Sequence, residues 1–253
     1  MNKIYVTTCP KYAEILKVWL YLCNKFWQPN PEIVVLGNGE CTIDLPDNAT
    51  FVNVGDNVDY SVWCKNMGDY FDSIDEEYIA PTMDDMWITA PVDIAQLDMI
   101  QKEAKRLSID RTYINRSYID TPKLREWCRK PKIVWGEDSS LFHAKGPKCY
   151  YFISLHVSIW NRKRFVELCR QCDTPWEMEV EGSVYAREHG YKCAIPHGPS
   201  PVLQTGVVLK FRDPGGPNHL FLETMPKDVL NHLKDNGHLD HWIKNGTTDI
   251  GLK

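Results

Sequence analysis

The chain has 253 residues and 43% of them are hydrophobic, so it can bury one substantial core, in one domain or in one domain plus a small lobe. Its net charge of -5 gives no overall attraction to nucleic acid, and no window approaches the roughly 18 consecutive apolar residues of a membrane span. No basic segment followed by an apolar one opens the chain, so we expect a cytoplasmic protein.

The nine cysteines lack the even, regular spacing of a disulfide framework. We therefore expect a reducing compartment and thiols that act as small buried apolar groups. Cys169 and Cys172, with Cys193 and His197, loosely match the ligand spacing of a zinc site. Cys169, however, shares the apolar face of a predicted helix with Phe165, which favours a structural thiol.

Strands and helices alternate in the first half of the chain. The expected elements are a strand at 3–7, a helix at 12–26, strands at 32–36 and 51–54, a helix at about 62–73, a strand that ends at Asp84 and Asp85, and a helix at 94–107 with Asp93 as its cap. This order predicts an α/β fold with a mostly parallel sheet flanked by helices. Residues 1–107 would then form the ligand-binding half of a single domain.

The second half, 108–253, is less regular. We expect strands at 133–135, 149–155 and 202–211, and helices at 162–171, 175–189 and 225–236. Gly237 is expected to end the last of these helices. The tail from 238 onward has little periodicity and is expected to wrap the surface.

The most informative feature is the adjacent acid pair Asp84 and Asp85 in the run YIAPTMDDMWITAPVD at 78–93. A strand buried on both faces has a continuous apolar sequence, and open α/β sheets bind ligands at the carboxyl ends of such strands. Two carboxylates there can hold Mg²⁺ or Mn²⁺, which prefer oxygen ligands and keep room for substrate phosphates. A solvated turn is the competing interpretation, because Asp-Asp pairs are common in turns.

A nucleotide is expected over the carboxyl end of the first strand. Thr7, Thr8 and Cys9 offer hydroxyls and backbone groups there for a base and ribose, and Asp59 is a second candidate for contacting either group. Any strand-to-helix turn contains residues of these types. No Gly-x-Gly-x-x-Gly or Walker-type loop follows the strand, which argues against a Rossmann dinucleotide site and a P-loop.

Acidic residues also cluster in TPWEMEVE at 174–181. Thr174 and Glu177 match a capping box with proline at the first helical position, so Glu177 has a structural role. Glu179 and Glu181 remain as candidates for a general base that takes the proton of an attacking hydroxyl. The alternative is that these acids only complement the positive end of the helix dipole.

Five blocks occur in a fixed order: YVTTC at 5–9, WCKNM at 63–67, the acid pair with PVD at 91–93, ISLHVSIW at 153–160 and TPWEME at 174–179. In this order the chain, over about residues 1–210, resembles a family of small GT-A-type glycosyltransferases of bacteria and phages. One departure is Met83, which stands where the first acid of the usual D-x-D motif would be. Many members of the family likewise have only an adjacent acidic pair.

The resemblance implies a GT-A-like fold and transfer of a sugar from a nucleoside diphosphate sugar, a UDP-sugar above others, to an acceptor hydroxyl. It places Asp85 on a Mn²⁺ or Mg²⁺ ion and Asp84 near the ribose or sugar. A divalent cation neutralises the charge that develops on the leaving diphosphate without a proton donor. The family's W-x-x-E pattern falls on Trp176 and Glu179, which makes Glu179 the first choice and Glu181 the second for the base of an inverting reaction.

Two histidines and two tryptophans have open roles. A late histidine often supplies a further metal ligand in this fold, and His197 and His219 are the available positions. Trp160 and Trp176 offer stacking surfaces for a sugar, but large aromatic side chains are more often part of the core. We assign Trp160 to the core and leave Trp176 open.

Two kinds of acceptor remain possible from the sequence. Basic residues alternate with aromatic ones in KLREWCRKPK at 123–132 and WNRKR at 160–164, which suits a polyanion such as phage DNA with hydroxymethylated pyrimidines. A base inside a duplex would also have to be flipped out. Both clusters equally suit ordinary solvated faces, and a surface glycan or lipopolysaccharide is an equal candidate acceptor.

Two other classes of protein share parts of this pattern. A metal-dependent nucleotidyltransferase would also place paired acids at a strand edge. A non-catalytic carbohydrate- or nucleic-acid-binding module would keep the aromatic residues without needing the acids.

Overall fold

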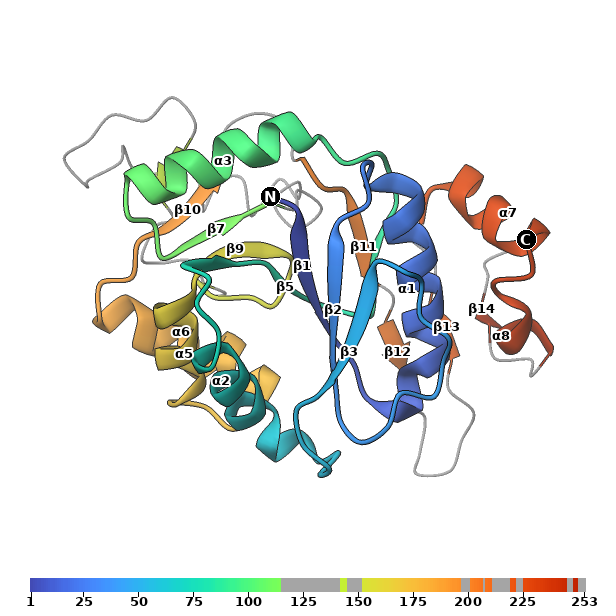
Figure 1. Cartoon of the computed structure of the whole chain (residues 1–253), viewed down its shortest axis with the longest axis horizontal. Coiled ribbons are helices and arrows are strands. Elements are labelled where there is room, and N and C mark those ends of the chain that lie inside the picture. The colour runs from blue at the N-terminus through green and yellow to red at the C-terminus, as the bar shows by residue number, and fades with distance from the viewer. Residues whose placement is uncertain are drawn as a thin grey trace.

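The computed structural model describes residues 1–114, 142–144, 152–196, 201–206, 208–210, 219–221, 225–244 and 248–249. Its centre is a four-stranded sheet in the order β3-β2-β1-β5, in which every neighbouring pair of strands is parallel (Figure 1). The strands are β1 Lys3–Thr7, β2 Glu32–Gly37, β3 Ala49–Asn53 and β5 Pro81–Met83. The expected α/β fold with a mostly parallel sheet is confirmed.

Alternate side chains of the central strands enter two separate cores. On β1, Ile4 and Val6 pack in one core with helix α1 Ala13–Phe26, whereas Tyr5 packs in the other with helix α2 Trp63–Asp72. Successive side chains of a strand point to opposite faces, so a strand buried on both faces must be apolar throughout. Helix α3 Ile94–Arg106 adds its apolar stripe to the core that contains α1.

A second, mixed sheet has the strand order β4-β9-β7-β10-β8. Its strands are β4 Tyr78–Ile79, β9 Ser158–Asn161, β7 Arg111–Tyr113, β10 Cys193–Pro196 and β8 Phe142–Ala144. Only Ala80 separates β4 from β5, so the two sheets are joined at this point. Helices α5 Arg162–Cys169 and α6 Pro175–Glu188 share a core with α2.

The strand expected at 149–155 is wrong over 152–155, where the structure has none, and 149–151 and 133–135 lie outside the described residues. The side chains here are buried as in a strand, but the backbone N–H groups bind side chains instead of a neighbouring strand. Ile153 N–H donates to Ser183 Oγ over 2.8 Å and Leu155 N–H to Glu179 Oε1 over 2.7 Å. These distant partners cannot be inferred from the local pattern.

The other expected helices, at 12–26, 62–73, 94–107, 162–171, 175–189 and 225–236, are confirmed with small shifts of their ends. The late strand expected at 202–211 is present as β11 Gln204–Gly206, paired with β6 Met86–Ile88, and as β12 Val208–Lys210. A small sheet joins β12 to β13 His219–Phe221 and β14 Thr248–Asp249.

Helix α7 Lys227–Asp235 lies beside α1, and Gly237 follows it with a φ of 73°, a left-handed conformation that suits glycine (Figure 1). Contact with α1 includes a 2.5 Å hydrogen bond between Tyr21 Oη and His232 Nε2. The tail therefore begins with ordered structure, including the short helix α8 Asp240–Lys244. In the described part of the chain, no helix has the length and apolarity needed to cross a membrane.

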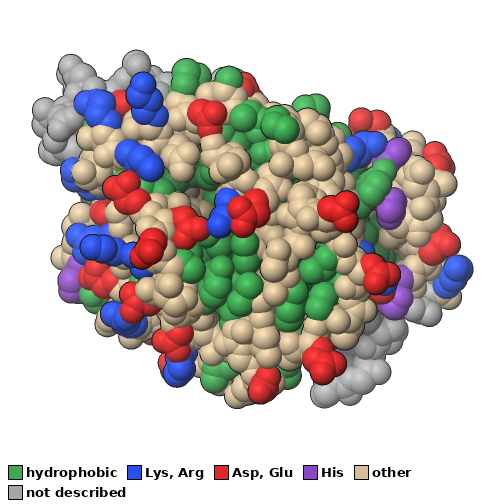
Figure 2. All heavy atoms as spheres, in the orientation of Figure 1, with side chains coloured by type: hydrophobic (Ala, Val, Ile, Leu, Met, Phe, Trp, Pro, Cys, Tyr) green, Lys and Arg blue, Asp and Glu red, His purple; other side chains and the backbone are tan. Residues whose placement is uncertain are grey.

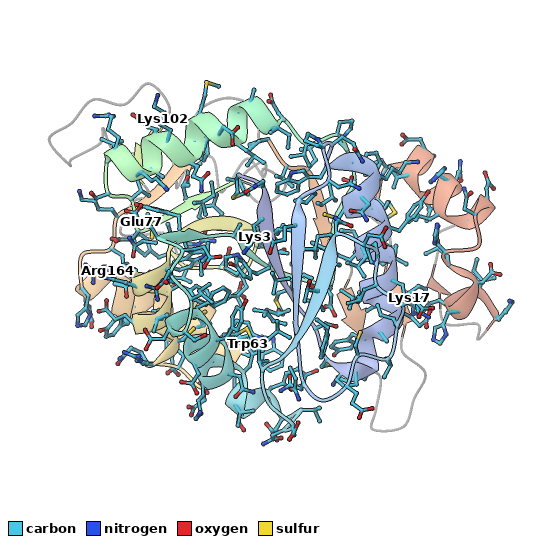
Figure 3. All side chains as sticks on the ribbon, in the orientation of Figure 1. Lys3, Lys17, Trp63, Glu77, Lys102 and Arg164 are labelled. Carbon is cyan, nitrogen blue, oxygen red and sulfur yellow. The ribbon has the colours of Figure 1, made fainter. Side chains whose placement is uncertain are left out.

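The two ends of the central sheet differ in character. At the amino end, Lys3 Nζ binds Glu76 over 3.0 Å and Glu32 over 3.1 Å (Figure 3). At the carboxyl end, Trp63 begins α2 and lines a hollow together with Thr7. The carboxyl end is where ligands bind in sheets of this kind.

Asp93 was expected to cap the helix after the acid pair, and its side chain accepts the Gln96 N–H over 2.9 Å. We expect Asp93→Ala to lower the free energy of unfolding by about 1 kcal/mol, because this N–H loses its acceptor. Asp93→Asn is the matched control, since asparagine caps equally well. Urea unfolding measures both; equal losses in the two variants would contradict the capping role.

Candidate active site

Asp84 and Asp85 occupy a tight turn between β5 and β6 at the carboxyl edge of the central sheet. The register of the parallel pair places Met83 opposite Thr7, the last residue of β1. One residue further, Asp84 N–H donates to the Thr7 carbonyl over 3.2 Å. The acid pair therefore lies directly beside the end of β1, as its position after the apolar run predicts.

Asp84 is the inner of the two acids, with only 4% of its surface exposed. Thr8 Oγ1 donates to its Oδ2 over 2.6 Å. Burial, followed by the charge of Asp85, holds the pKa of Asp84 well above its ordinary range, and the hydrogen bond from Thr8 opposes this rise. Asp84 is thus fixed by β1 and needs positive charge nearby to remain ionised.

Asp85 is half-buried, and its Oδ1 is buried without a hydrogen-bond partner. Burial raises the pKa of Asp85 to about 6, and the charge of Glu179 adds to the rise. A buried carboxylate oxygen without a partner is costly in a folded protein. A hard divalent cation is a suitable partner, because Mg²⁺ and Mn²⁺ bind carboxylate oxygens and retain water and phosphate ligands. Oδ1 of Asp85 is therefore the atom to which such a cation would bind.

Other metal ligands are not assembled within the described residues, where no group of three or more histidine, cysteine or acidic side chains could hold an ion. His197, the expected further ligand, lies outside these residues, and the side chain of His219 is likewise not described. Cys169 and Cys193 are buried free thiols, as expected for apolar fillers. Of the two residues expected to bind the metal, Asp85 and His197, only Asp85 lies within the described residues.

The three acids in the first half of α6 have three different positions. Thr174 and Glu177 form the expected capping box, in which each side chain accepts a backbone N–H of the other's position. Glu179 faces the acid pair, since its Oε1 accepts the Leu155 N–H and its charge raises the pKa of Asp85. Glu181 is exposed and points away, because two helical residues differ by about 200°. Of the two candidate bases, Glu179 is the one beside the acids.

Arg111 on β7 holds the segment that carries Leu155, and the sequence analysis missed it. Its guanidinium is fully buried, and Nη2 donates to the Ser154 carbonyl over 2.5 Å and to Ser158 Oγ over 2.8 Å. The guanidinium lies 3.6 Å from the centre of the Tyr113 ring. Nε and Nη1 have no hydrogen-bond partner. Arg111 thereby fixes residues 154–158, the segment whose Leu155 N–H binds Glu179.

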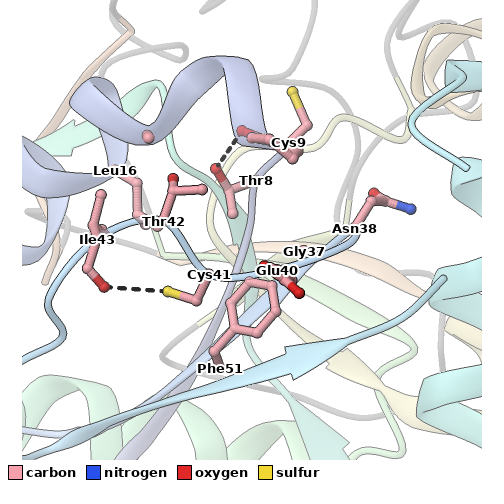
Figure 4. A pocket seen from close by; sticks show the side chains of 12 residues that line it. Thr8, Cys9, Leu16, Gly37, Asn38, Glu40, Cys41, Thr42, Ile43 and Phe51 are labelled. Atoms are coloured by element: carbon pink, nitrogen blue, oxygen red, sulfur yellow. Dashed lines mark hydrogen bonds between the residues drawn. The ribbon is translucent and has the colours of Figure 1, made fainter. Parts of the chain in front are cut away.

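A small hollow opens at the carboxyl ends of β1 and β2 (Figure 4). Thr8 and Cys9 line it, as expected for a nucleotide site, together with Asn38 and Glu40 from the loop after β2. Phe51 forms an apolar wall close to Gly37, where an added Cβ would lie 2.6 Å from the ring. Burial and the charge of Asp84 raise the pKa of Cys9 to about 11, so the thiol stays protonated.

Asn38 and Glu40 were missed, although a signal for them exists. They follow the second strand of a parallel sheet, and the carboxyl ends of neighbouring parallel strands meet at one edge. Polar residues at that position in the chain are therefore candidates by the same reasoning that selected Thr8.

Two predicted nucleotide residues lie apart from this hollow. Thr7 is buried, with Oγ1 3.4 Å from the Thr82 carbonyl, and lines the separate hollow beside Trp63. Asp59 is exposed and caps the short 3₁₀ helix η2 Tyr60–Val62, where the Ser61 N–H donates to it over 2.8 Å and lowers its pKa. The structure thus brings together Thr8, Cys9, Asp84, Asp85 and Glu179.

In comparisons with known proteins, no protein-family model matches the chain, and no curated protein matches it at a significant level. What the fold and the site define is an α/β protein with an acid pair and a hollow at the carboxyl edge of a parallel sheet. The functional assignment depends on the geometry of this site.

The raised pKa of Asp85 predicts a stability gain from removing its charge. A carboxyl group that binds its proton more tightly in the folded state loses stability as the pH rises from about 4 to about 6. We expect Asp85→Asn to raise the free energy of unfolding at pH 7 by roughly 1 to 3 kcal/mol. At pH 4 the two proteins should be nearly equal.

Asp59→Asn is the control, because the pKa of Asp59 is lowered and its carboxylate is already stabilised in the folded state. Urea unfolding of the metal-free proteins between pH 4 and pH 7 measures the difference. A loss of stability in Asp85→Asn at pH 7 would show that the unpartnered oxygen has a favourable contact in the folded protein.

Proposed function

We propose that this protein is a glycosyltransferase with a GT-A-like arrangement, which moves a sugar from a nucleoside diphosphate sugar to an acceptor hydroxyl. The observation that carries the proposal is the unpartnered, buried Oδ1 of Asp85, next to a second carboxylate, Glu179, at the carboxyl edge of the sheet. The proposal therefore assigns the cation to Asp85 and the general base to Glu179.

We assign the nucleoside of the donor to the hollow at the ends of β1 and β2. Thr8, Asn38 and Glu40 offer polar groups there, and Phe51 offers an apolar surface for a base. Thr8 also donates to Asp84, so the hollow adjoins the acid pair through one side chain. The diphosphate of a donor bound in this hollow extends toward Asp85, where a bound Mn²⁺ or Mg²⁺ neutralises charge on the leaving group.

Glu179 is the proposed base. Leu155 N–H orients its Oε1, and the helix α6 places the carboxylate beside the acid pair. As the acceptor oxygen bonds to the anomeric carbon, the bond from that carbon to the phosphate oxygen breaks, and the hydroxyl proton passes to Glu179. Attack opposite the leaving group gives an inverting reaction.

Seven described cysteines, among them Cys9, Cys41 and Cys64, are free thiols, which supports a reducing compartment for this enzyme. Nucleotide sugars are made in such a compartment in bacteria, so we place the reaction in the cytoplasm of a bacterium or of a phage-infected cell.

Thermal shift with a panel of nucleotide sugars tests the donor and the metal together. We expect one nucleotide sugar to raise the midpoint of unfolding only with Mn²⁺ or Mg²⁺, because binding to the folded state stabilises it. Asp85→Asn should lose this metal-dependent shift. Asp98→Asn is the control, since Asp98 binds the amino terminus at the far end of the sheet. A shift with nucleoside triphosphates but with no nucleotide sugar would instead indicate a nucleotidyltransferase.

The base is tested by comparing two acids of the same helix. Glu179→Gln should lower kcat by about 10² to 10⁴ while the donor-induced thermal shift remains, because the amide cannot accept the proton. Glu181→Gln should lower kcat less than tenfold, since that side chain points away from the acids. Similar losses of kcat in the two variants would remove Glu179 from the role of base.

A further inference from the structure

An exposed aromatic cluster lies at the surface beside the candidate active site. Trp176, near the start of α6, has 58% of its surface exposed, and the edge-to-face pair that it forms with Tyr60 has ring centres 4.9 Å apart. Tyr60 Oη lies 2.8 Å from the hydroxyl of Tyr12, the last residue of the 3₁₀ helix η1 Pro10–Tyr12. Lys11 Nζ lies over both tyrosine rings, 5.0 and 4.5 Å from their centres.

One end of this cluster lies near the acid pair, and the other end lies near Glu179. On one side, Tyr12 N–H donates to the Cys9 carbonyl over 2.9 Å, and Cys9 directly follows Thr8, whose hydroxyl binds Asp84. On the other side, Trp176 precedes Glu179 by three residues, so the two side chains share one side of α6. A group that rests on Trp176 therefore lies within one helical turn of the proposed base.

The charges around the cluster disfavour a polyanion. The segments 10–12, 59–62 and 173–181, which form it, contain five acidic residues and one lysine. Acidic side chains also predominate along the lower edge of the face in Figure 2, the edge at which β1 ends in Figure 1. Phosphate groups of nucleic acid are bound by lysine and arginine, which are scarce here.

The basic cluster at 160–164 does not supply the missing positive charge. Arg162 donates to the carbonyls of Glu76 and Phe71, each over 2.9 Å. Arg164 pairs with Glu167 over 2.8 Å and with Asp110 over 3.4 Å. Both arginine side chains are thus engaged in contacts within the protein. The other basic cluster, at 123–132, lies outside the described residues.

We propose that Trp176 and Tyr60 form a platform for an uncharged sugar ring of a glycan acceptor. This inference rests on the proposed function, since it names the acceptor of the same site. A pyranose ring has an apolar C–H face that packs on an aromatic ring and a rim of hydroxyls that hydrogen-bond to polar groups such as tyrosine hydroxyls. A ring stacked on Trp176 presents a hydroxyl toward Glu179.

NMR of the full chain tests this platform without relying on activity. The indole N–H signal of Trp176 is identified by its loss in Trp176→Phe, and the wild-type protein is titrated with neutral methyl hexosides and short neutral oligosaccharides. We expect at least one saccharide to shift this signal. A 5-hydroxymethylcytosine oligonucleotide should leave it unchanged. Shifts by the oligonucleotide alone, or by no saccharide, would overturn the proposal.

Kinetics and donor binding separate this inference from the function on which it rests. Trp176→Ala should raise KM for the saccharide acceptor about tenfold or more with a smaller effect on kcat, and Trp176→Phe should restore much of the loss. Val184→Ala, an exposed apolar residue two turns further along α6, is the control and should keep the wild-type KM.

The metal-dependent thermal shift with the nucleotide sugar should be the same in Trp176→Ala as in the wild type. A lost shift in Trp176→Ala would place the ring against the donor and overturn the acceptor platform while leaving the glycosyltransferase proposal in place. Absence of any nucleotide-sugar shift in the wild type would instead overturn the glycosyltransferase proposal.

Discussion

The site depends on two carboxyl groups held where water reaches them poorly. Asp84 is nearly enclosed, and Oδ1 of Asp85 is buried without a hydrogen-bond donor. Glu179 adds a third negative charge nearby. Burial and the repulsion among the three carboxylates raise the free energy of their ionised forms at neutral pH. Burial and repulsion therefore disfavour the ionised forms of Asp84 and Asp85, and a positively charged ligand would relieve this cost.

The rest of the structure holds these acids in place from two sides. On the first side, the parallel pair of β1 and β5 fixes Asp84 through the Thr7 carbonyl and the Thr8 hydroxyl. On the second side, α6 and the segment 152–158 position Glu179, and the buried Arg111 holds that segment. The two sides belong to different sheets, which meet at Ala80, so a shift of one sheet against the other would change the distance between Asp85 and Glu179.

Local sequence was sufficient for the helices, the central parallel strands, the acid pair and the helix caps, but not for strands β7, β9 and β10 of the second sheet. The cap at Asp93 and the box of Thr174 and Glu177 involve residues three apart, and buried strands are visible as apolar runs. The contacts of Arg111, and the bond from Leu155 to Glu179, join residues 24 or more positions apart. Such partners leave no periodic signal. The run at 152–155 predicts a strand because it is apolar. Its side chains are buried as in a strand, and only its distant hydrogen-bond partners show that it is not one.

Helical geometry explains why acids so close in sequence have separate roles. Within α6, Glu177 is turned back to the helix start, Glu179 toward the acid pair, and Glu181 toward solvent, where its charge acts on Cys172 instead. Trp176 lies on the same side of α6 as Glu179 and is exposed. The other side of the helix supplies the apolar side chains that enter the core. Trp176 is thus open to a partner from solution. The acidic residues around it, Glu179 among them, disfavour a negatively charged partner.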